Sequence, residues 1–289
     1  MSDFRFPDWR SLDQARLDHE YSPSRIAKDF HGDLARYAAQ TAQARQTGIC
    51  LERAYGKAPR QLLDIYLPPT PSSSAAPIHV FIHGGFWQDL NKDYAGFAAP
   101  AFTREGMIFI AVNYTLAPQA SLAAITAEIR QAMDWILAQA TTLNGDRQRI
   151  VVSGHSAGGY LAASLIAGSL AETRGPAPIA GLLPISGVFD LPPIAACYVN
   201  KALGLDAAEA TRLDLMQAKP LLDIPVHFAV GQDESAEFRR HSQALHAAWA
   251  PQLRQSVCDL RPGRDHFDIL FELSTPGAPL HRAAMALIS

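Results

Sequence analysis

Apolar residues along this chain fall into short blocks that alternate with longer periodic stretches. Six blocks are apolar at successive positions, which is typical of strands buried on both faces of a sheet. They lie at residues 78–82, 107–113, 149–152, 179–185, 225–230 and 255–260. Between the second and third blocks, residues 121–140 carry one apolar stripe at helical spacing, formed by Leu122, Ile125, Ile129, Met133 and Ile136. This alternation predicts an α/β fold with a mostly parallel central sheet and helices on both faces.

The first 48 residues have a different pattern. Residues 24–46 carry mostly apolar side chains at helical spacing with charges between them, which predicts an amphipathic helix packed on another part of the chain. Those side chains are Ile26, Phe30, Leu34, Tyr37 and Thr41. We therefore expect an N-terminal helical extension over residues 1–48 and a main domain over residues 49–289.

Three further segments fall outside the alternation. Strand-like runs at residues 50–55 and 61–67 flank a Gly-Lys-Ala-Pro turn, which predicts a hairpin at the edge of the sheet. Residues 68–77, rich in Pro and Ser, are expected to form a surface connection. Residues 190–220 hold Leu-Pro-Pro, short helical pieces and several polar residues, and we interpret them as a lid inserted over the active edge of the sheet.

Composition narrows the class of protein. Hydrophobic residues make up 48% and charged residues 18% of the 289 residues, enough for a sizeable core and far from a disordered chain. The formal charge is -3 and no run of Lys or Arg occurs, which argues against a nucleic acid or an anionic membrane surface as a partner. We expect a small-molecule substrate.

The cysteines and the apolar runs indicate the cellular compartment of the protein. Cys50, Cys197 and Cys258 are far apart and form no C-x-x-C pair, so neither a disulfide framework nor a zinc site is indicated. The first residues lack the pattern of a signal peptide, and no apolar run approaches the roughly 20 residues of a membrane span. A cytoplasmic protein is expected.

The strongest candidate for chemistry is Gly154-His155-Ser156-Ala157-Gly158. It follows the strand at residues 149–152 and precedes a helical pattern over residues 160–170. A G-x-S-x-G nucleophile elbow requires this strand–turn–helix context, because the serine sits on a tight, strained turn that presents its hydroxyl above the sheet. The alternative is an ordinary glycine-rich turn, which most isolated matches are.

A serine nucleophile requires a base and an acid that orients it. In this architecture both follow the serine in the chain, the acid before the histidine, each on a loop after a strand. His266 has that placement, directly after the strand at residues 255–260, whereas the other downstream histidines fall in helical patterns or inside a strand. For the acid, Asp233 and Glu234 both follow the strand at residues 225–230, and the pattern alone does not separate them.

Donors for a developing oxyanion are suggested by His83-Gly84-Gly85-Phe86-Trp87, directly after the strand at residues 78–82. The backbone N–H groups of Gly85 and Phe86, with that of Ala157, have the placement needed to point at the reacting carbonyl. We expect His83 to brace this loop by hydrogen bonds. No cluster of His and carboxylates has metal-ligand spacing, so we expect no metal and no cofactor.

Three motifs together resemble the α/β-hydrolase superfamily in its esterase and lipase branch: residues 83–87, residues 154–159, and Val112-Asn113-Tyr114-Thr115-Leu116-Ala117-Pro118. More narrowly, the chain resembles kynurenine formamidases (arylformamidases) from Tyr21-Ser22-Pro23 through His266-Phe267. That family usually has Tyr before Trp in the first motif, where this chain has Phe86. The resemblance implies an α/β-hydrolase fold. It also implies that the acid precedes Ser235-Ala236-Glu237-Phe238 and is therefore Glu234.

The resulting hypothesis is a serine hydrolase that cleaves a small aryl formamide or short-chain ester through an acyl-enzyme, with Ser156, His266 and Glu234 as its triad. Two alternatives stay open: a general carboxylesterase unrelated to tryptophan breakdown, and a non-catalytic binding protein of the same fold. A homodimer is one possible assembly. Aromatic residues near Ser156, among them Trp87 and Tyr160, are expected to form a flat slot for an aromatic leaving group, or else to pack the loops.

Overall fold

The computed structural model describes residues 8–70, 73–168 and 175–288, and its centre is an eight-stranded sheet in the order β1-β2-β4-β3-β5-β6-β7-β8. The β1–β2 and β2–β4 pairs are antiparallel and every later pair is parallel. The strands are β1 (Ile49–Ala54), β2 (Leu62–Leu67), β3 (Ala76–Ile82), β4 (Ile108–Val112), β5 (Gly145–His155), β6 (Gly181–Ile185), β7 (Pro225–Gly231) and β8 (Gln255–Arg261). The predicted hairpin and the predicted, mostly parallel sheet are both confirmed.

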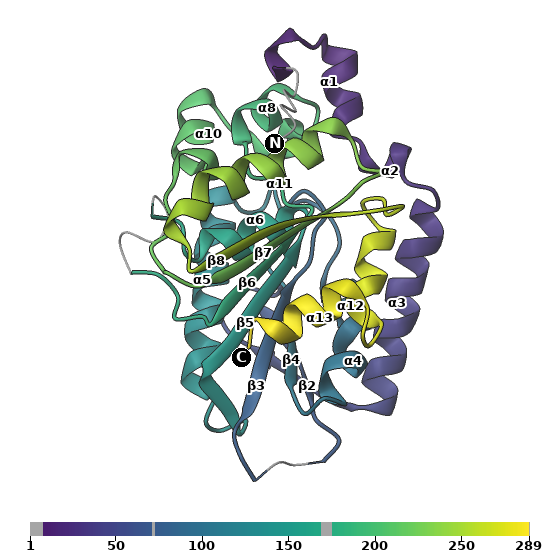
Figure 1. The fold of residues 1–289 in the computed structure, drawn as a ribbon, viewed down its shortest axis with the longest axis vertical. Coiled ribbons are helices and arrows are strands. Elements are labelled where there is room, and N and C mark those ends of the chain that lie inside the picture. Colours follow the sequence, from purple (N-terminus) through teal and green to yellow (C-terminus); the bar gives the residue numbers. More distant parts are fainter. Residues whose placement is uncertain (1–7, 71–72, 169–174, 289) are drawn as a thin grey trace.

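Helices cover both faces of this sheet, as the alternation predicted (Figure 1). They are α1 (Gln14–Glu20), α2 (Pro23–Ile26), α3 (Phe30–Thr47), α4 (Ala99–Thr103), α5 (Leu122–Gln139), α6 (Ala157–Ser164), α8 (Leu191–Ala196), α9 (Asn200–Leu203), α10 (Ala207–Leu213), α11 (Ala236–Trp249), α12 (Phe271–Ser274) and α13 (Pro279–Ala286). The expected stripe of α5 is buried.

Alternation along the strands divides the core into two layers. Val80 and Val152 face the layer that holds α5, α6 and α11. Their neighbours Phe81 and Val151 face the layer that holds α3, α4 and α13. Because successive side chains of a strand point to opposite faces, a strand covered on both sides must be apolar at every position.

The last strand, β8, departs from that expectation. It lies at the edge of the sheet with β7 as its partner, and Val257 and Leu260 are each 37% exposed. The apolar run at residues 255–260 therefore belongs to a half-covered edge strand and not to one buried on both faces.

The amphipathic helix expected over residues 24–46 is interrupted. The chain leaves α2 after Ile26 and begins α3 at Phe30, where the side chain of Asp29 caps the helix by accepting from the Gly32 N–H. In the gap, the backbone N–H of Lys28 donates to the carboxylate of Asp265, 2.9 Å away. A contact with a residue far away in the sequence therefore divides the helix. The local spacing of apolar residues does not indicate such a break.

The helix after the elbow is shorter than expected. It ends at Ser164, since the next backbone segment pairs with another part of the chain: Gly168 N–H donates to Lys219 O and Leu221 N–H to Ile166 O. Three parts of the expected elements lie outside the described residues: the first seven residues of the extension, residues 71–72 of the surface connection, and residues 169–170 of the expected helix.

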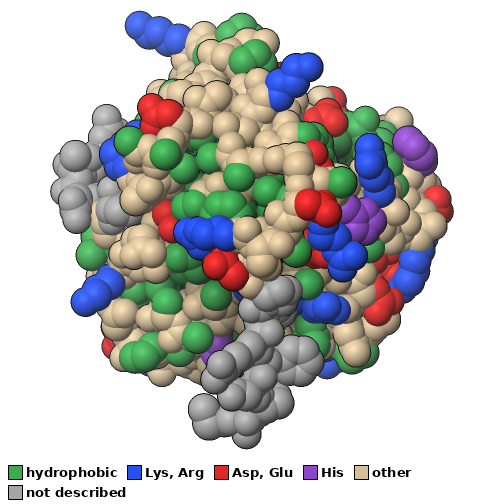
Figure 2. All heavy atoms as spheres, turned by 90° about the horizontal axis from the view of Figure 1, so that it is seen from above, with side chains coloured by type: hydrophobic (Ala, Val, Ile, Leu, Met, Phe, Trp, Pro, Cys, Tyr) green, Lys and Arg blue, Asp and Glu red, His purple; other side chains and the backbone are tan. Residues whose placement is uncertain are grey.

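The face of the molecule in Figure 2 shows no cluster of basic side chains among the described residues. In Figure 2, basic and acidic side chains are intermingled over the described part of the face shown. Within the described residues, no helix has both the length and the apolar character needed to cross a membrane.

Candidate active site

Ser156 lies on the turn between β5 and α6, with φ 54° and ψ −119°. A non-glycine residue rarely adopts such angles, and the surrounding packing enforces them here. A Cβ atom added at Gly154 would lie 2.0 Å from the Gly158 carbonyl oxygen, and one added at Gly158 would lie 2.1 Å from the Ile82 carbonyl oxygen. The two glycines are therefore required for the chain to turn this sharply, which excludes the ordinary flexible turn.

His266 and Glu234 meet beside this turn. His266 Nδ1 and Glu234 Oε2 are 2.6 Å apart, and both side chains are buried. The other carboxylate oxygen, Oε1, accepts from Ser186 Oγ at 2.6 Å and from the Gly231 N–H at 2.7 Å. The Ser156 hydroxyl has no direct hydrogen bond to His266 here, although both side chains line one cavity. Such contacts commonly tighten only when substrate binds.

Asp233, the other candidate acid, points elsewhere. Its carboxylate pairs with Lys28 Nζ at 2.8 Å on the surface, where both side chains are substantially exposed. Successive residues after a strand project in different directions, so only one of the two acids reaches the imidazole. Asp233 instead anchors the N-terminal extension.

The loop after β3 is held in an uncommon conformation. Gly85, Phe86 and Trp87 all have positive φ angles, of 104°, 47° and 60°. The carbonyl of Gly85 accepts from the N–H groups of both Gln88 and Asp89 at 2.9 Å, which closes the loop on itself. Among the described residues, no backbone acceptor engages the N–H groups of Gly85, Phe86 or Ala157. These three donors are available to a ligand, as an oxyanion hole requires.

His83 braces this loop as expected. Its Nδ1–H donates to the Gly84 carbonyl at 2.8 Å, and its ring stacks on Tyr114 with the ring centres 4.3 Å apart. Burial lowers the pKa of His83 to about 4, so the ring is neutral at physiological pH. His83 therefore supports the loop without adding a charge to it.

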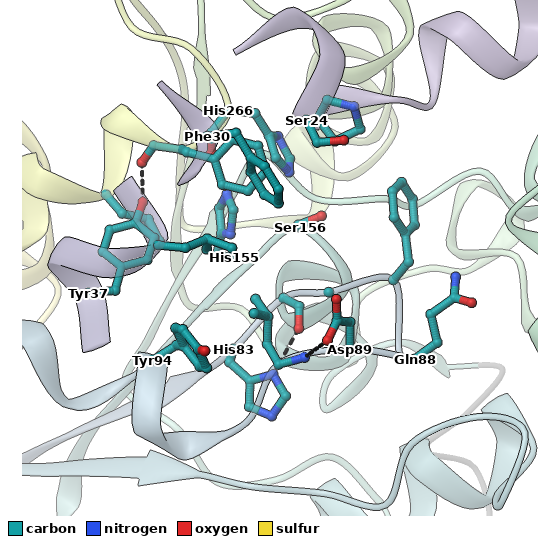
Figure 3. A pocket seen from close by; sticks show the side chains of 18 of the residues that line it. Ser24, Phe30, Tyr37, His83, Gln88, Asp89, Tyr94, His155, Ser156 and His266 are labelled. Carbon is teal, nitrogen blue, oxygen red and sulfur yellow. Dashed lines mark hydrogen bonds between the residues drawn. The ribbon is translucent and has the colours of Figure 1, made fainter. Parts of the chain in front are cut away.

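Ser156 opens into a cavity of about 260 Å³ (Figure 3). One wall comes from the N-terminal extension, with Phe30, Leu34 and Tyr37, and another from residues 83–86 and 88–90. Within residues 190–220, Tyr198 alone appears among the described lining residues. The sequence pattern suggested a lid at residues 190–220, whereas the extension supplies more of the cavity wall.

Trp87 and Tyr160, suggested as substrate contacts, are not among the described residues that line this cavity. Both are fully buried and pack edge to face with ring centres 5.3 Å apart. The Tyr160 hydroxyl donates to the Leu213 carbonyl at 2.8 Å. The expectation is corrected for these two residues, because they pack the loops. The aromatic side chains that line the cavity include Phe30, Phe86, Tyr94 and Phe267.

Three side chains that the sequence reading did not single out organise the histidine loop. Ser186 bonds to Glu234, and His155 donates its Nε2–H to the His266 carbonyl at 2.7 Å. The buried carboxylate of Asp265 accepts from the N–H groups of Phe267 and Asp268 and from that of Lys28. Burial alone would raise the pKa of Asp265, but these backbone donors hold it below its usual range. Ser186 and Asp265 each follow a strand within a few residues, and this placement is the sequence feature that indicates a position near the site.

Along the chain, the serine follows β5, the carboxylate follows β7 and the histidine follows β8. That order on a mostly parallel sheet is the order of the α/β-hydrolases, and it defines the class of this protein. No group of three or more His, Cys, Asp or Glu suited to a metal occurs in the described part of the chain.

Comparison with known proteins narrows the class. The chain is 31% identical over 281 residues to a kynurenine formamidase of Danio rerio, a match that covers 92% of this chain and 93% of that protein. The chain belongs to the kynurenine formamidase family. The BD-FAE family model matches residues 63–175.

Solved structures agree on the fold. A protein of Silicibacter sp. TM1040, provisionally described as a thioesterase, superposes with a TM-score of 0.81 at 25% identity over 93% of this chain and 98% of its own. Esterase B of Lactobacillus rhamnosis superposes with a TM-score of 0.72 at 22% identity, over 94% and 96% of the two chains. The family match shows an enzyme, a hydrolase of the arylformamidase type, and the solved structures show the same fold.

Proposed function

We propose that this chain is a serine hydrolase that cleaves aryl formamides through an acyl-enzyme, with Ser156 as nucleophile, His266 as general base and acid, and Glu234 as the acid that orients His266. The observation that carries the proposal is the 2.6 Å contact between His266 and Glu234 at a cavity that Ser156 also lines. The family match supports the same assignment.

The proposed reaction runs in two halves. Ser156 Oγ attacks the carbonyl carbon while His266 Nε2 takes the hydroxyl proton, and Glu234 stabilises the imidazolium that forms. The N–H groups of Gly85, Phe86 and Ala157 donate to the tetrahedral oxyanion. His266 returns the proton to the leaving amine as the C–N bond breaks, which leaves a formyl ester on Ser156. Water, deprotonated by His266, then attacks this ester and releases formate.

The cavity supports an aromatic leaving group. Phe30 and Phe267 contact each other edge to face, with ring centres 4.8 Å apart, and both line the cavity beside His266. Aromatic side chains bind flat apolar rings well. A formyl group needs little room beside the oxyanion donors. N-formyl-kynurenine, the substrate indicated by the name of the Danio rerio relative, combines these two features.

A general carboxylesterase would use the same groups on a different substrate. Esterase B of Lactobacillus rhamnosis, which has the same fold, is consistent with this alternative. The deciding experiment compares kcat/KM for N-formyl-kynurenine with kcat/KM for short p-nitrophenyl esters. A clear preference for the formamide supports the proposal, whereas a preference for the esters would replace it with the carboxylesterase.

A non-catalytic binding protein would leave Ser156 unreactive. Labelling with a fluorophosphonate tests this directly, and a protein that is not labelled would contradict the serine mechanism.

We also propose a cytoplasmic site of action, which fits the unpaired state of Cys50, Cys197 and Cys258. Light scattering distinguishes a monomer from the homodimer.

A further inference from the structure

Asp89 is an unpaired anion on the wall of the candidate active site. Among the described residues that line the cavity, it alone is an Asp, Glu, Lys or Arg. Its Oδ1 accepts from the Leu90 N–H at 2.7 Å, a local contact that leaves Oδ2 open. No Lys, Arg or His of the described chain lies within ion-pair distance of this carboxylate. Figure 3 shows Asp89 across the cavity from Phe30.

Two of the histidines that line the cavity, His83 and His155, do not offset this charge. Burial lowers the pKa of His83 to about 4. Burial and the neighbouring His266 lower the pKa of His155 well below its usual range. Both rings are therefore neutral at pH 7. Neither ring therefore neutralises the carboxylate of Asp89.

The position of Asp89 is fixed by its backbone. The Asp89 N–H donates to the Gly85 carbonyl, and the next residue, Leu90, has φ 66°. The nearby guanidinium of Arg60 donates to the carbonyls of Leu90, at 2.7 Å, and Tyr114, at 3.0 Å, and not to Asp89. Strained non-glycine residues persist where the surrounding structure over-determines them, often at ligand sites. The carboxylate of Asp89 is thus held in place without a cationic side chain to pair with it.

We propose that Asp89 binds a protonated amine carried on the aromatic part of the substrate and so makes the enzyme selective for cationic or zwitterionic aryl formamides. This inference rests on the proposed function, since a formyl group contains no nitrogen and the amine must therefore belong to the leaving group. Because Asp89 is exposed, the effect is that of one partly screened ion pair, about three- to tenfold in affinity or kcat/KM.

Binding without turnover tests the proposal independently of the reaction. Calorimetric titration of benzylammonium and of the neutral benzyl alcohol into Ser156→Ala, and into the same variant with Asp89→Asn, compares two ligands that differ in charge. Asn keeps the size of Asp89 and an oxygen for the Leu90 N–H. We expect the preference for benzylammonium to fall three- to tenfold with Asp89→Asn and to weaken at high salt. An unchanged preference would overturn the proposal.

Turnover supplies a second test. Formanilides with an aminomethyl group at ring position 2, 3 or 4 are compared with their methyl counterparts. The ratio of the two kcat/KM values cancels any general effect of a substitution, and we expect Asp89→Asn to lower it three- to tenfold for at least one ring position, mainly through KM. The matched control is Glu105→Gln, an exposed carboxylate outside the cavity lining, which should leave the ratio unchanged. Equal ratios in the wild type and Asp89→Asn at all three positions would also overturn the proposal.

The two hypotheses fail in different ways. If no formanilide is cleaved, the proposed function is wrong, and the titration still decides whether Asp89 binds the amine. If the formanilides are cleaved but neither the ratio nor the binding preference responds to Asp89→Asn, the proposed function stands and the role of Asp89 is wrong.

Discussion

His266 Nδ1 lies 2.6 Å from Glu234 Oε2, at the point where the loops after β7 and β8 meet. The carboxylate cannot swing away, because its second oxygen is held by Ser186 Oγ and the Gly231 N–H. A carboxylate fixed in this way holds the imidazole in the tautomer that leaves Nε2 free to accept a proton. In the proposed mechanism, the contact therefore determines which nitrogen of His266 accepts the proton of Ser156.

The first prediction separates the two adjacent acids. Glu234→Gln should lower kcat by about three to four orders of magnitude, because the amide no longer favours that tautomer or stabilises the imidazolium. Asp233→Asn should change kcat less than threefold, because it removes only an exposed pair with Lys28. Steady-state kinetics of the purified variants check this, and the reverse order would transfer the role to Asp233.

The second prediction concerns the nucleophile. Ser156→Ala should lower kcat by about four to six orders of magnitude and abolish fluorophosphonate labelling, because triad members act as a unit. The fold should persist, since the Ser156 side chain makes no hydrogen bond within the described residues. Circular dichroism and thermal unfolding give the control. Near-normal turnover by a folded variant would exclude the serine mechanism.

Much of the fold could be predicted from the sequence, because its determinants are local. Five of the six apolar runs and the stripe on α5 record burial directly, and the run at residues 255–260 forms the half-covered edge strand. The elbow was visible because its serine and both glycines stand within five residues, although the close contact that requires Gly158 is with the distant Ile82 carbonyl. The order of serine, acid and histidine then followed from the topology.

The parts that were missed depend on contacts between distant segments. Trp87 belongs to the motif at residues 83–87 and Tyr160 directly follows the elbow motif, yet both side chains turn into the core and pack on each other. Phe30 is far from Ser156 in sequence, yet it lines the cavity because Asp265 interrupts the helix at Lys28 and lets α3 begin beside the site. Sequence spacing carries no information on such pairings.

The third prediction concerns the acyl group. For derivatives of one aromatic leaving group, kcat/KM should be highest for formyl or acetyl and fall steeply through butyryl to octanoyl, since the cavity holds only about 260 Å³ and must also admit the ring. The esters of a single phenol provide the series with constant leaving-group chemistry. A maximum at octanoyl would indicate a lipase-like pocket and contradict a formamidase.

The fourth prediction concerns stability and pH at Asp214, a carboxylate only 4% exposed. Burial raises its pKa to about 7, so between about pH 4 and pH 7 the folded protein keeps a proton that the unfolded chain releases. The unfolded state then binds fewer protons, and the contribution of Asp214 to the free energy of unfolding must fall as pH rises through this window. A shift of about three units corresponds to a loss of about 4 kcal/mol at most above pH 7.

Asp214→Asn removes this proton linkage and keeps an oxygen that can accept from the Met216 N–H, as Oδ1 does at 3.0 Å. We expect the variant to match the wild type near pH 4 and to become progressively more stable than the wild type up to pH 8. Urea unfolding at four pH values measures the difference. The matched control is Asp206→Asn, which changes an exposed helix cap that accepts from the Glu209 N–H. Its stability relative to the wild type should not rise progressively between pH 4 and pH 8. A stability difference for Asp214→Asn that stays constant from pH 4 to pH 8 would mean that Asp214 is already ionised in the folded protein at low pH, with a partner that offsets its burial.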